Sequence, residues 1–345
     1  MRVWRLRPWR ARPGANREGT TAGLRLCSMR SPLRRRCGYD TIMQRFAPRK
    51  FREARRPAGR SAKGMKTDKK NGNRIGPRPV ALDTAAGRAL MKSWSADLRL
   101  CATDVDGTIT MEDADAPAHV RGCLHPAAYE QIQRLAAAGV RVALVTGRPL
   151  PTAEGLALYL GLTDRNRTEI GHPIVAENGA VVKMNGKVTR LARAPRRRAL
   201  AAARAMLEAK PFKGACELTF DNKRRICDVG VHTPPELLPQ ARAYFERRPE
   251  LGLQAVTSNI MSHVVCARAS KARALDWVLE RMDLDPRNVI VFGDSDTDIP
   301  LFEAFERSVA VSNYFDGTRD PGLPAAAAPL PGGAGFAAAC RLLAV

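Results

Sequence analysis

The sequence predicts an α/β fold: a Rossmann-like, doubly wound parallel sheet with an inserted α+β module, preceded by a disordered basic segment. Three observations lead to this prediction. Short apolar runs alternate with helical patterns over residues 98–180 and again after residue 270. Residues 181–267 instead contain hairpin-like pairs of strands and two further helices. Residues 1–92 show no sustained hydrophobic period.

The charge of the chain is concentrated towards its N-terminal end. The formal net charge is +23 over 345 residues, yet residues 1–100 alone hold 27 Lys and Arg against 6 Asp and Glu. That is a net charge of +21, which leaves +2 for the rest of the chain. The folded part is therefore nearly neutral, and the charge of the whole chain does not indicate its partners.

Residues 1–92 are rich in Gly, Ala, Arg and Pro. Such a segment buries too little apolar surface to offset its chain entropy, so we expect disorder. Three interpretations remain open: a basic tail that binds nucleic acid, an organelle transit peptide, or an upstream extension that is not translated. We favour the last, with the true start at Met91 or Met65, because these four residue types have GC-rich codons and Met91 directly precedes the first apolar run.

The cysteines indicate a reducing compartment. None of the eight forms a Cys-x-x-Cys pair, and Cys101, Cys227 and Cys266 lie in apolar, strand-like runs. This pattern is typical of reduced thiols in a cytoplasmic protein. No apolar stretch approaches the ~20 residues that span a bilayer, so we expect no membrane association. We expect a monomer or a homodimer.

The first strand of the sheet ends at a pair of carboxylates. The apolar run of residues 98–105 predicts a buried strand, and Asp104 and Asp106 project to the same side where it stops. Gly107 then allows the backbone to turn away. Ligands bind at the carboxyl ends of parallel strands, and two carboxylates this close favour a bound cation or a shared proton.

The next two strands also end in polar residues. A helix over residues 126–138 precedes a strand over 141–145, which ends in Thr146-Gly147-Arg148. A hydroxyl and backbone N–H groups before the next helix, residues 152–159, can hold an anion. A third buried strand, residues 173–176, leads into Glu177-Asn178-Gly179.

The pattern then changes to the inserted module. Residues 181–191 predict a hairpin whose turn is Asn185-Gly186. The order that follows is helix, strand, strand, helix, strand, strand, which predicts an α+β unit of about 80 residues. The expected ranges are 195–209, 216–220, 226–231, 235–247, 253–256 and 263–267.

The alternating pattern resumes at residue 270. A helix over residues 270–282 carries Lys271 in its first turn, and a strand over 288–292 ends in a run that includes Asp294 and Asp298. A helix through 305, a strand at 308–311 and a helix at 335–343 follow. We therefore expect a disordered segment 1–92, a core formed by 93–182 and 262–345, and a cap formed by 183–261.

These strand ends converge on one crevice in a doubly wound sheet, and their chemistry suits phosphoryl transfer. Asp104 is a carboxylate that can attack phosphorus, and Asp106 can protonate the leaving oxygen and then deprotonate water. Thr146 and Lys271 would hold phosphoryl oxygens. Asp294 and Asp298 add negative charge, so a hard cation such as Mg2+ is required beside a phosphate dianion.

Four motifs follow one another along the chain: Asp104-Val105-Asp106-Gly107-Thr108, Thr146, Lys271, and the run from Gly293 to Asp298. In this order they resemble the motifs of the haloacid dehalogenase superfamily, with a subfamily IIB-like cap. The resemblance covers residues 98–345. It implies Asp104 as the nucleophile, Asp106 as the acid and base, and Mg2+ held by the Asp104 side chain, the Asp106 backbone carbonyl and Asp294. Asp298 would act on the water shell of the metal or on Lys271. An acid at Asp106 disfavours dehalogenase chemistry.

The cap resembles that of the branch with sucrose-phosphate phosphatases and archaeal-type phosphoglycolate phosphatases. The motif Glu177-Asn178-Gly179 and a His eight residues before the lysine (His263 before Lys271) are similar to the latter group. The resemblance implies a phosphatase, with phosphoglycolate as the leading substrate and Thr146, Gly147, Asn178 and Lys271 as phosphate-binding or substrate-binding residues.

Several cap residues are more typical of a solvated or structural role. The loop of residues 221–225 could offer Lys223, Arg224 or Arg225 to an anionic leaving group, but a solvated loop is the commoner case. His232 and His263 are more typical of packed or surface histidines than of ligands. We expect the cap to close over a small phosphate ester and to exclude water.

Two alternative functions remain open. A phosphotransferase or phosphomutase of sugar phosphates would use the same aspartyl-phosphate and transfer it to a sugar. A nucleic-acid-associated protein would use the basic N-terminal arm, with salt-sensitive binding. We expect a small-molecule phosphate ester as the partner, and no nucleic acid.

Overall fold

The computed structural model describes residues 66–67, 74–75, 78–112, 122–163, 171–192, 194–258, 261–316, 318 and 320–345. All of them lie in one unit, Ser61–Val345. Residues 66–67 and 74–75 form a short antiparallel pair, β1 (Lys66–Thr67) and β2 (Arg74–Ile75). The expectations about disorder, nucleic acid and a transit peptide in residues 1–65 lie outside the described residues.

A nine-stranded sheet forms the core, and β4 lies near its centre between β13 and β5. The strands β3, β15, β14, β13, β4, β5 and β6, which are neighbours in this order, run parallel to one another. The hairpin β7–β8 adds two antiparallel strands at one edge. In sheet order the strands are β3 (Val80–Ala81), β15 (Ala326–Ala327), β14 (Ser308–Ala310), β13 (Val289–Gly293), β4 (Leu100–Thr103), β5 (Arg141–Val145), β6 (Ile174–Ala176), β7 (Val181–Met184) and β8 (Lys187–Arg190). The chain winds from β4 in both directions, so the doubly wound prediction is confirmed.

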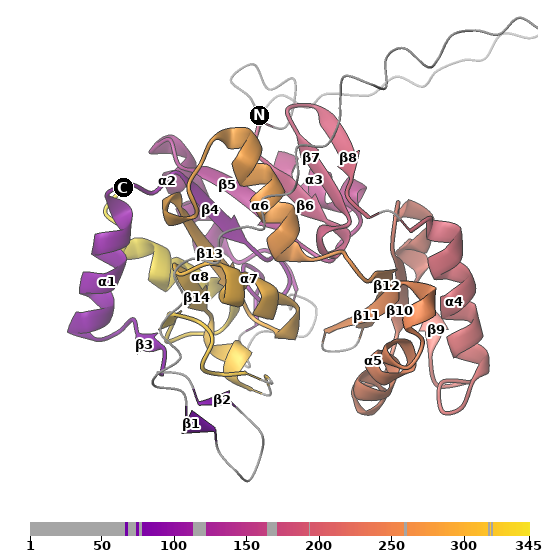
Figure 1. Cartoon of the computed structure of the whole chain (residues 1–345). Coiled ribbons are helices and arrows are strands. Elements are labelled where there is room, and N and C mark those ends of the chain that lie inside the picture. The colour runs from indigo at the N-terminus through magenta and orange to yellow at the C-terminus, as the bar shows by residue number, and fades with distance from the viewer. Residues whose placement is uncertain are drawn as a thin grey trace, which may run out of the picture. The chain divides into compact units, whose positions relative to one another are not determined.

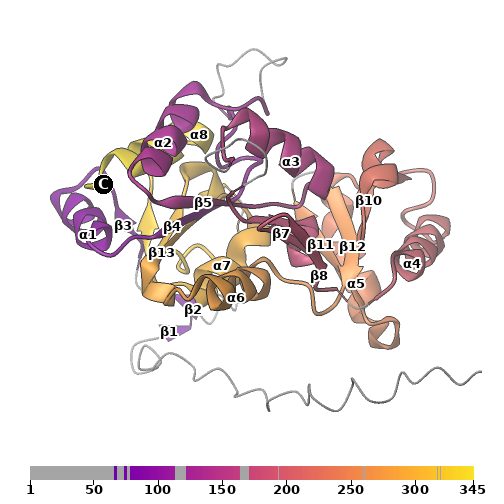
Figure 2. The ribbon, with the colours of Figure 1, turned by 90° about the horizontal axis from the view of Figure 1, so that it is seen from above.

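Helices cover both faces of this sheet. Figure 2 shows α2 (Pro126–Ala137), α3 (Leu150–Tyr159) and α8 (Gly332–Arg341) on one face, and α6 (Lys271–Met282) and α7 (Ile299–Ala304) on the other. Side chains alternate between two apolar clusters accordingly: Cys101 and Leu144 pack with α2, α3 and α8, while Ala102 and Val145 pack with α6 and α7. Strands buried on both faces read as continuous apolar runs, which explains why the sequence identified them.

The folded part begins earlier than expected. Strand β3 pairs with β15, and α1 (Ala85–Ser95) starts at Thr84, whose side chain accepts the N–H of Gly87. Leu82, Met91 and Trp94 are buried in the core. Residues 80–92 therefore belong to the folded unit rather than to a disordered segment, and a chain that began at Met91 would lack β3 and half of α1.

The cap also differs from its expected limits. The hairpin β7–β8 forms as predicted, with Asn185 and Gly186 at φ 50° and 70° as a two-residue turn requires, but it extends the core sheet. The cap proper runs from α4 (Arg196–Glu208) to β12 (Met261–Cys266), so residues 183–190 belong to the core and residues 262–266 to the cap. Figure 1 shows the cap elements grouped together beside the core sheet.

The cap is an antiparallel sheet with two helices packed against it. The sheet order is β11-β12-β10-β9, and α4 and α5 (Leu238–Glu246) enclose an apolar cluster that includes Phe212, Phe245 and Val264. The other strands are β9 (Glu217–Leu218), β10 (Val229–His232) and β11 (Leu253–Ser258). The predicted order of helices and strands is confirmed. Strand β9 is shorter than expected, because residues 220–224 form a 3-10 turn in which the Asn222 amide donates to Gly230 O.

None of the helices in the described part of the chain is long and apolar enough to cross a membrane.

Candidate active site

Asp104 and Asp294 follow the two central strands of the sheet. Asp104 comes directly after β4, and its N–H donates to Phe292 O at 3.0 Å, which fixes it between β4 and β13. Asp294 follows β13. The turn at Gly107 (φ +79°) brings the backbone so close to Asp294 that a Cβ there would collide with the carboxylate. Both side chains are therefore held at the switch point of the sheet, where ligands bind.

Three buried carboxylates meet at this point. Asp104, Asp294 and Asp298 each offer an oxygen, and these oxygens lie within 4.8 Å of one another. Thr108 Oγ1 donates to Asp294 Oδ1 at 3.0 Å, and Asn313 Nδ2 donates to Oδ2 at 3.3 Å. Asp298 Oδ2 accepts the N–H groups of Asp294 and Ser295. The cluster is thus oriented by neighbouring donors.

Lys271 supplies a buried positive charge to this cluster. Its Nζ lies 3.1 Å from Asp104 Oδ1 and 2.8 Å from Asp298 Oδ1, and it donates to Thr297 Oγ1 at 3.0 Å. Although burial opposes it, the charges of Asp104 and Asp298 raise the pKa of Lys271 above its ordinary value. The ammonium is therefore charged and neutralises only one of the three carboxylates.

The donor set fits a hard divalent cation. Burial raises the pKa of Asp104 to about 7. The charge of Lys271 lowers this pKa, and the charges of Asp298 and Asp106 raise it. Burial and the charge of Asp104 also raise the pKa of Asp294 well above its ordinary value. Carboxylates in this state gain stability from a cation, and an all-oxygen set is what Mg2+ prefers.

Asp106 lies apart from this cluster. Its side chain is 58% exposed and forms an ion pair with Arg148, whose Nε donates to Oδ2 at 2.9 Å. The three-carboxylate group therefore does not include the side chain of Asp106, and any role in metal binding would fall to its backbone carbonyl. An exposed carboxylate at the mouth of the site remains accessible to water and protons.

Thr146 and Gly147 follow β5, which pairs with β4, the strand that ends directly before Asp104. Thr146 is fully buried, and its Oγ1 accepts the N–H of Arg148 at 3.1 Å. Its backbone N–H and C=O are bonded to Val175 O and to the N–H of Asn178. These bonds hold the loop after β5 against the loop after β6.

A cavity of about 360 Å³ joins most of the predicted residues. Asp104, Asp106, Gly147, Asn178, Lys271 and Asp294 line it, whereas Thr146 and Asp298 do not. The cap contributes Asp221, Arg225, Ser258, Met261 and His263. The structure thus brings the core residues together under the cap.

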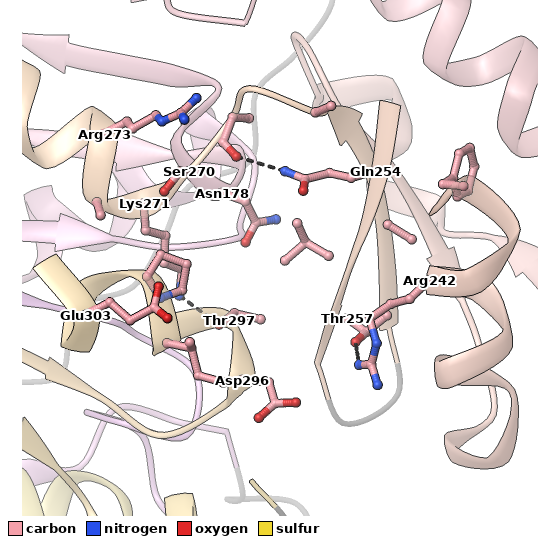
Figure 3. Close-up of a pocket in the computed structure, with 18 of the residues that line it drawn as sticks. Asn178, Arg242, Gln254, Thr257, Ser270, Lys271, Arg273, Asp296, Thr297 and Glu303 are labelled. Atoms are coloured by element: carbon pink, nitrogen blue, oxygen red, sulfur yellow. Dashed lines mark hydrogen bonds between the residues drawn. The ribbon is translucent and has the colours of Figure 1, made fainter. Parts of the chain in front are cut away.

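A larger cavity of about 700 Å³ is also lined by Lys271. It shares Asn178, Lys271 and Thr297 with the smaller one. Figure 3 shows these core residues opposite Gln254, Thr257 and Arg242 of the cap, with Glu303 and Arg273 from the core helices. The two cavities therefore meet at the same lysine.

Glu177 joins the core to the cap. It is fully buried at φ 51°, and its carboxylate accepts three consecutive backbone N–H groups of the cap, from Ile226, Cys227 and Asp228. Arg225 Nη1 also donates to Gly147 O at 3.0 Å. The residues before β10 are thus bonded to both loops of the site.

The expectation of a solvated loop is wrong for Arg225, although Lys223 and Arg224 are exposed. The Arg225 guanidinium is buried and ion-paired to Asp221 and Asp228. His263, expected to be packed or at the surface, is packed against Asp228 and also lines the cavity.

The sequence contained a weak signal for some of the residues that were missed. Thr108 lies in the run Asp104-Val105-Asp106-Gly107-Thr108, and Arg148 lies in the run Thr146-Gly147-Arg148. Asn313, which contacts Asp294, lies three residues after the end of β14, in the loop that follows this strand. Asp228 carried no such signal, because it lies in the loop before β10 and its partner His263 lies 35 residues further along the chain on β12.

Comparison with known proteins places the chain in a family. The model of the haloacid dehalogenase-like hydrolases matches residues 101–210 and 206–317, which is more than half of the chain. A phosphoglycolate phosphatase of Metallosphaera sedula is 30% identical over 63% of this chain and 86% of its own length. One of Aeropyrum pernix is 29% identical over 61% of this chain and 80% of its own length.

Solved structures share the fold. Protein 0175 of Thermoplasma acidophilum matches with a TM-score of 0.58 at 22% identity, over 71% of this chain and 99% of its own. A HAD/COF-like hydrolase of Plasmodium vivax matches with a TM-score of 0.56 at 18% identity, over 73% and 98% of the two chains. The predicted superfamily and the prediction of a hydrolytic enzyme are confirmed: the chain belongs to the haloacid dehalogenase-like hydrolase family.

Proposed function

We propose that this hydrolase is a Mg2+-dependent phosphatase of small phosphate monoesters, with phosphoglycolate as the leading substrate. The observation that carries the proposal is the buried Asp104 carboxylate beside Lys271, Asp294 and Asp298, in a cavity that the cap covers. Relatives named phosphoglycolate phosphatase, at 29% and 30% identity, support the choice of substrate.

Asp104 is the proposed nucleophile. Its carboxylate oxygen attacks phosphorus and forms an aspartyl-phosphate, while the bond from phosphorus to the leaving oxygen breaks. Asp106 gives its proton to that oxygen and then takes a proton from the attacking water. Water attack on phosphorus releases phosphate and restores the Asp104 carboxylate. The exposure of Asp106 suits this exchange of protons, and Arg148 keeps its carboxylate at the mouth of the site.

Lys271, Thr146, Gly147 and Asn178 are the proposed phosphate-binding and substrate-binding residues. Lys271 already contacts Asp104, so its ammonium can stabilise the charge that develops on the phosphoryl oxygens. Asp104, Asp294 and the Asp106 backbone carbonyl would hold Mg2+, with Asp298 orienting Lys271 or metal-bound water. Bound Mg2+ supplies neutralisation of the phosphate charge and polarisation of the phosphoryl group.

Phosphotransfer to a sugar is the second candidate. The larger cavity favours it, because about 700 Å³ next to Lys271 can hold an acceptor or a bulky leaving group. The experiment that separates the two measures inorganic phosphate and transferred phosphate in parallel. The full chain is incubated with phosphoglycolate, sugar phosphates or p-nitrophenyl phosphate, with Mg2+ or with EDTA, with and without a sugar acceptor. Phosphate release to water supports a phosphatase, and transfer to the sugar supports the alternative.

The cytoplasm is the proposed location, on the cysteine pattern of the sequence. The expected monomer or homodimer and the nucleic-acid alternative stay predictions.

A further inference from the structure

The cap holds a buried polar cluster that the proposed chemistry does not use. Asp228 is fully buried and binds Arg225 Nη1 at 2.9 Å and His263 Nδ1 at 3.1 Å. Asp221 binds the other end of the Arg225 guanidinium at 2.8 Å. Arg225, Asp228 and His263 are buried, and Asp221 is partly exposed. Burying three ionisable groups together is costly unless they serve a defined geometry.

The register of the cap sheet creates the space for this cluster. His263 on β12 lies opposite Gly230 on β10. A Cβ at Gly230 would lie 3.2 Å from Arg225 Nε, so the missing side chain makes room for the guanidinium beside the imidazole. Arg225 is paired with two carboxylates through Nη1 and Nη2, and only its buried Nε has no hydrogen-bond partner among the described residues. Its effect is to hold Asp228, and through Asp228 the ring of His263.

The ring presents its other nitrogen to the site. Both hydrogen-bond contacts of His263 use Nδ1, and Nε2 lies 3.5 Å from the position that a Cβ of Gly147 would take. The Asn178 amide lies 3.2 Å and 3.3 Å from that same position, through Oδ1 and Nδ2. Two polar groups, one from the cap and one from the core, therefore converge on a single point above Gly147.

One of these groups lacks a partner. Nδ2 of Asn178 is buried and forms no hydrogen bond with any group that the structure describes. A buried donor without an acceptor is destabilising, so it indicates a place for an acceptor oxygen. In the proposed function, Asp104 and Lys271 contact the phosphoryl group. The point above Gly147 is therefore assigned to the leaving group of the substrate.

We propose that Asn178 Nδ2 and His263 Nε2 bind a carboxylate on the leaving group of the substrate, and that Asp228 and Arg225 are positioning residues for the imidazole. This inference rests on the proposed phosphatase function and names the determinant of its substrate class. The small cavity, about 360 Å³, suits an ester in which the carboxylate is only a few bonds from phosphorus. Phosphoglycolate has this geometry.

The test compares two esters with the same skeleton in the full chain with Mg2+: phosphoglycolate, and ethyl phosphate, in which a methyl replaces the carboxylate. The measured quantity is the ratio of kcat/KM for the two. Removing a hydrogen bond to a charged group should lower this ratio by about 10- to 100-fold in His263→Ala, mainly through the KM of phosphoglycolate. His263→Gln, which keeps an amide near Nε2, should recover part of the loss.

Three further variants complete the design. Gly147→Ala places a methyl at the point of convergence and should lower the same ratio, and the backbone there is not in the left-handed region. Asp228→Asn should raise the KM of phosphoglycolate less than His263→Ala does. His232→Gln is the matched control, because this histidine is exposed on β10 and does not line the cavity, so its ratio should equal that of the wild type.

Each outcome decides the inference. An equal loss on both esters in His263→Ala would contradict it and leave a structural role for the cluster. A wild-type enzyme that hydrolyses both esters equally well would also contradict it, while the phosphatase function would stand. A wild-type enzyme that hydrolyses no ester would overturn the proposed function, and the inference with it.

Discussion

The carboxylate of Glu177 accepts the backbone N–H of Cys227 at 2.6 Å, although the two residues are 50 positions apart. The same carboxylate accepts the N–H groups of Ile226 at 2.7 Å and Asp228 at 3.0 Å. Burial and the charge of Asp228 raise the pKa of Glu177, so the three N–H groups hold a carboxylate that the surroundings would otherwise disfavour. The position of the cap residues 226–228 at the site therefore depends on one core side chain.

Glu177→Ala should destabilise the protein and loosen this part of the cap. The variant leaves three buried N–H groups without an acceptor, and each such group costs about 1–3 kcal/mol. We expect a loss of at least about 3 kcal/mol in the free energy of unfolding. Hydrogen exchange should accelerate at residues 226–228. The control is Glu154→Ala, which removes a partly exposed ion pair with Lys183 and should cost about 1 kcal/mol. Equal losses in the two variants would contradict this account.

Asp228→Asn should make the stability of the protein less sensitive to acid. Although burial opposes it, the His263 hydrogen bond and the Arg225 charge hold the pKa of Asp228 below its ordinary value. A carboxyl group of this kind stabilises the fold above its unfolded pKa of ~3.9, and the contribution is lost as the pH falls through the folded pKa. The difference in Tm between wild type and variant should therefore be largest near neutral pH and shrink below about pH 4. Thermal melts across this range measure it, and a constant difference would show that Asp228 does not act through its charge.

Removal of the residues before Met91 should weaken the fold. The loss of Leu82 alone, which is 2% exposed, resembles a large-to-small core substitution and should cost about 3 kcal/mol. The loss of β3 also exposes the edge of β15. Chains that begin at Met65 and at Met91 can be compared by thermal unfolding. A lower Tm for the Met91 chain is expected, and equal Tm values would mean that β3 and the first half of α1 contribute nothing to stability.

Asp294→Asn should abolish the stabilisation of the protein by Mg2+. A ligand that binds only the folded state raises Tm with its concentration, and the variant removes one of three converging carboxylates. We expect Mg2+ to raise the Tm of the wild type and of Asp283→Asn, which changes an exposed carboxyl group at the end of α6. A Mg2+-induced shift of the same size in Asp294→Asn would place the metal elsewhere.

Much of the core could be predicted from the sequence, because its signals are local. Buried parallel strands read as apolar runs, and polar residues at their ends are brought together by the topology alone. Asp104, Gly147, Lys271 and Asp294 meet in one cavity for this reason. The Asn185-Gly186 turn could also be predicted, because a two-residue hairpin turn requires positive φ at both positions, and Asn and Gly adopt it readily.

The remaining features depend on pairing between strands that are distant in sequence. The cluster of Arg225, Asp228 and His263 exists because β10 and β12 pair with Gly230 opposite His263. No local pattern encodes that register. The predicted start of the cap was wrong because the sequence of β7 and β8 indicates a hairpin but does not indicate which of the two sheets the hairpin joins. The burial of Leu82 and Met91 was masked by the Gly-, Ala-, Arg- and Pro-rich composition that precedes them.

The most direct test of the central claim is phosphate release by Asp104→Asn. Wild type and variant would be assayed as full chains with phosphoglycolate and p-nitrophenyl phosphate, with Mg2+ and with EDTA, beside Asp283→Asn as the control. The account predicts Mg2+-dependent release by the wild type and the control, and a loss of at least about 1000-fold in a folded Asp104→Asn, because the nucleophile is gone. Release by Asp104→Asn at the rate of the wild type would contradict the role of Asp104 and, with it, the proposed aspartyl-phosphate chemistry.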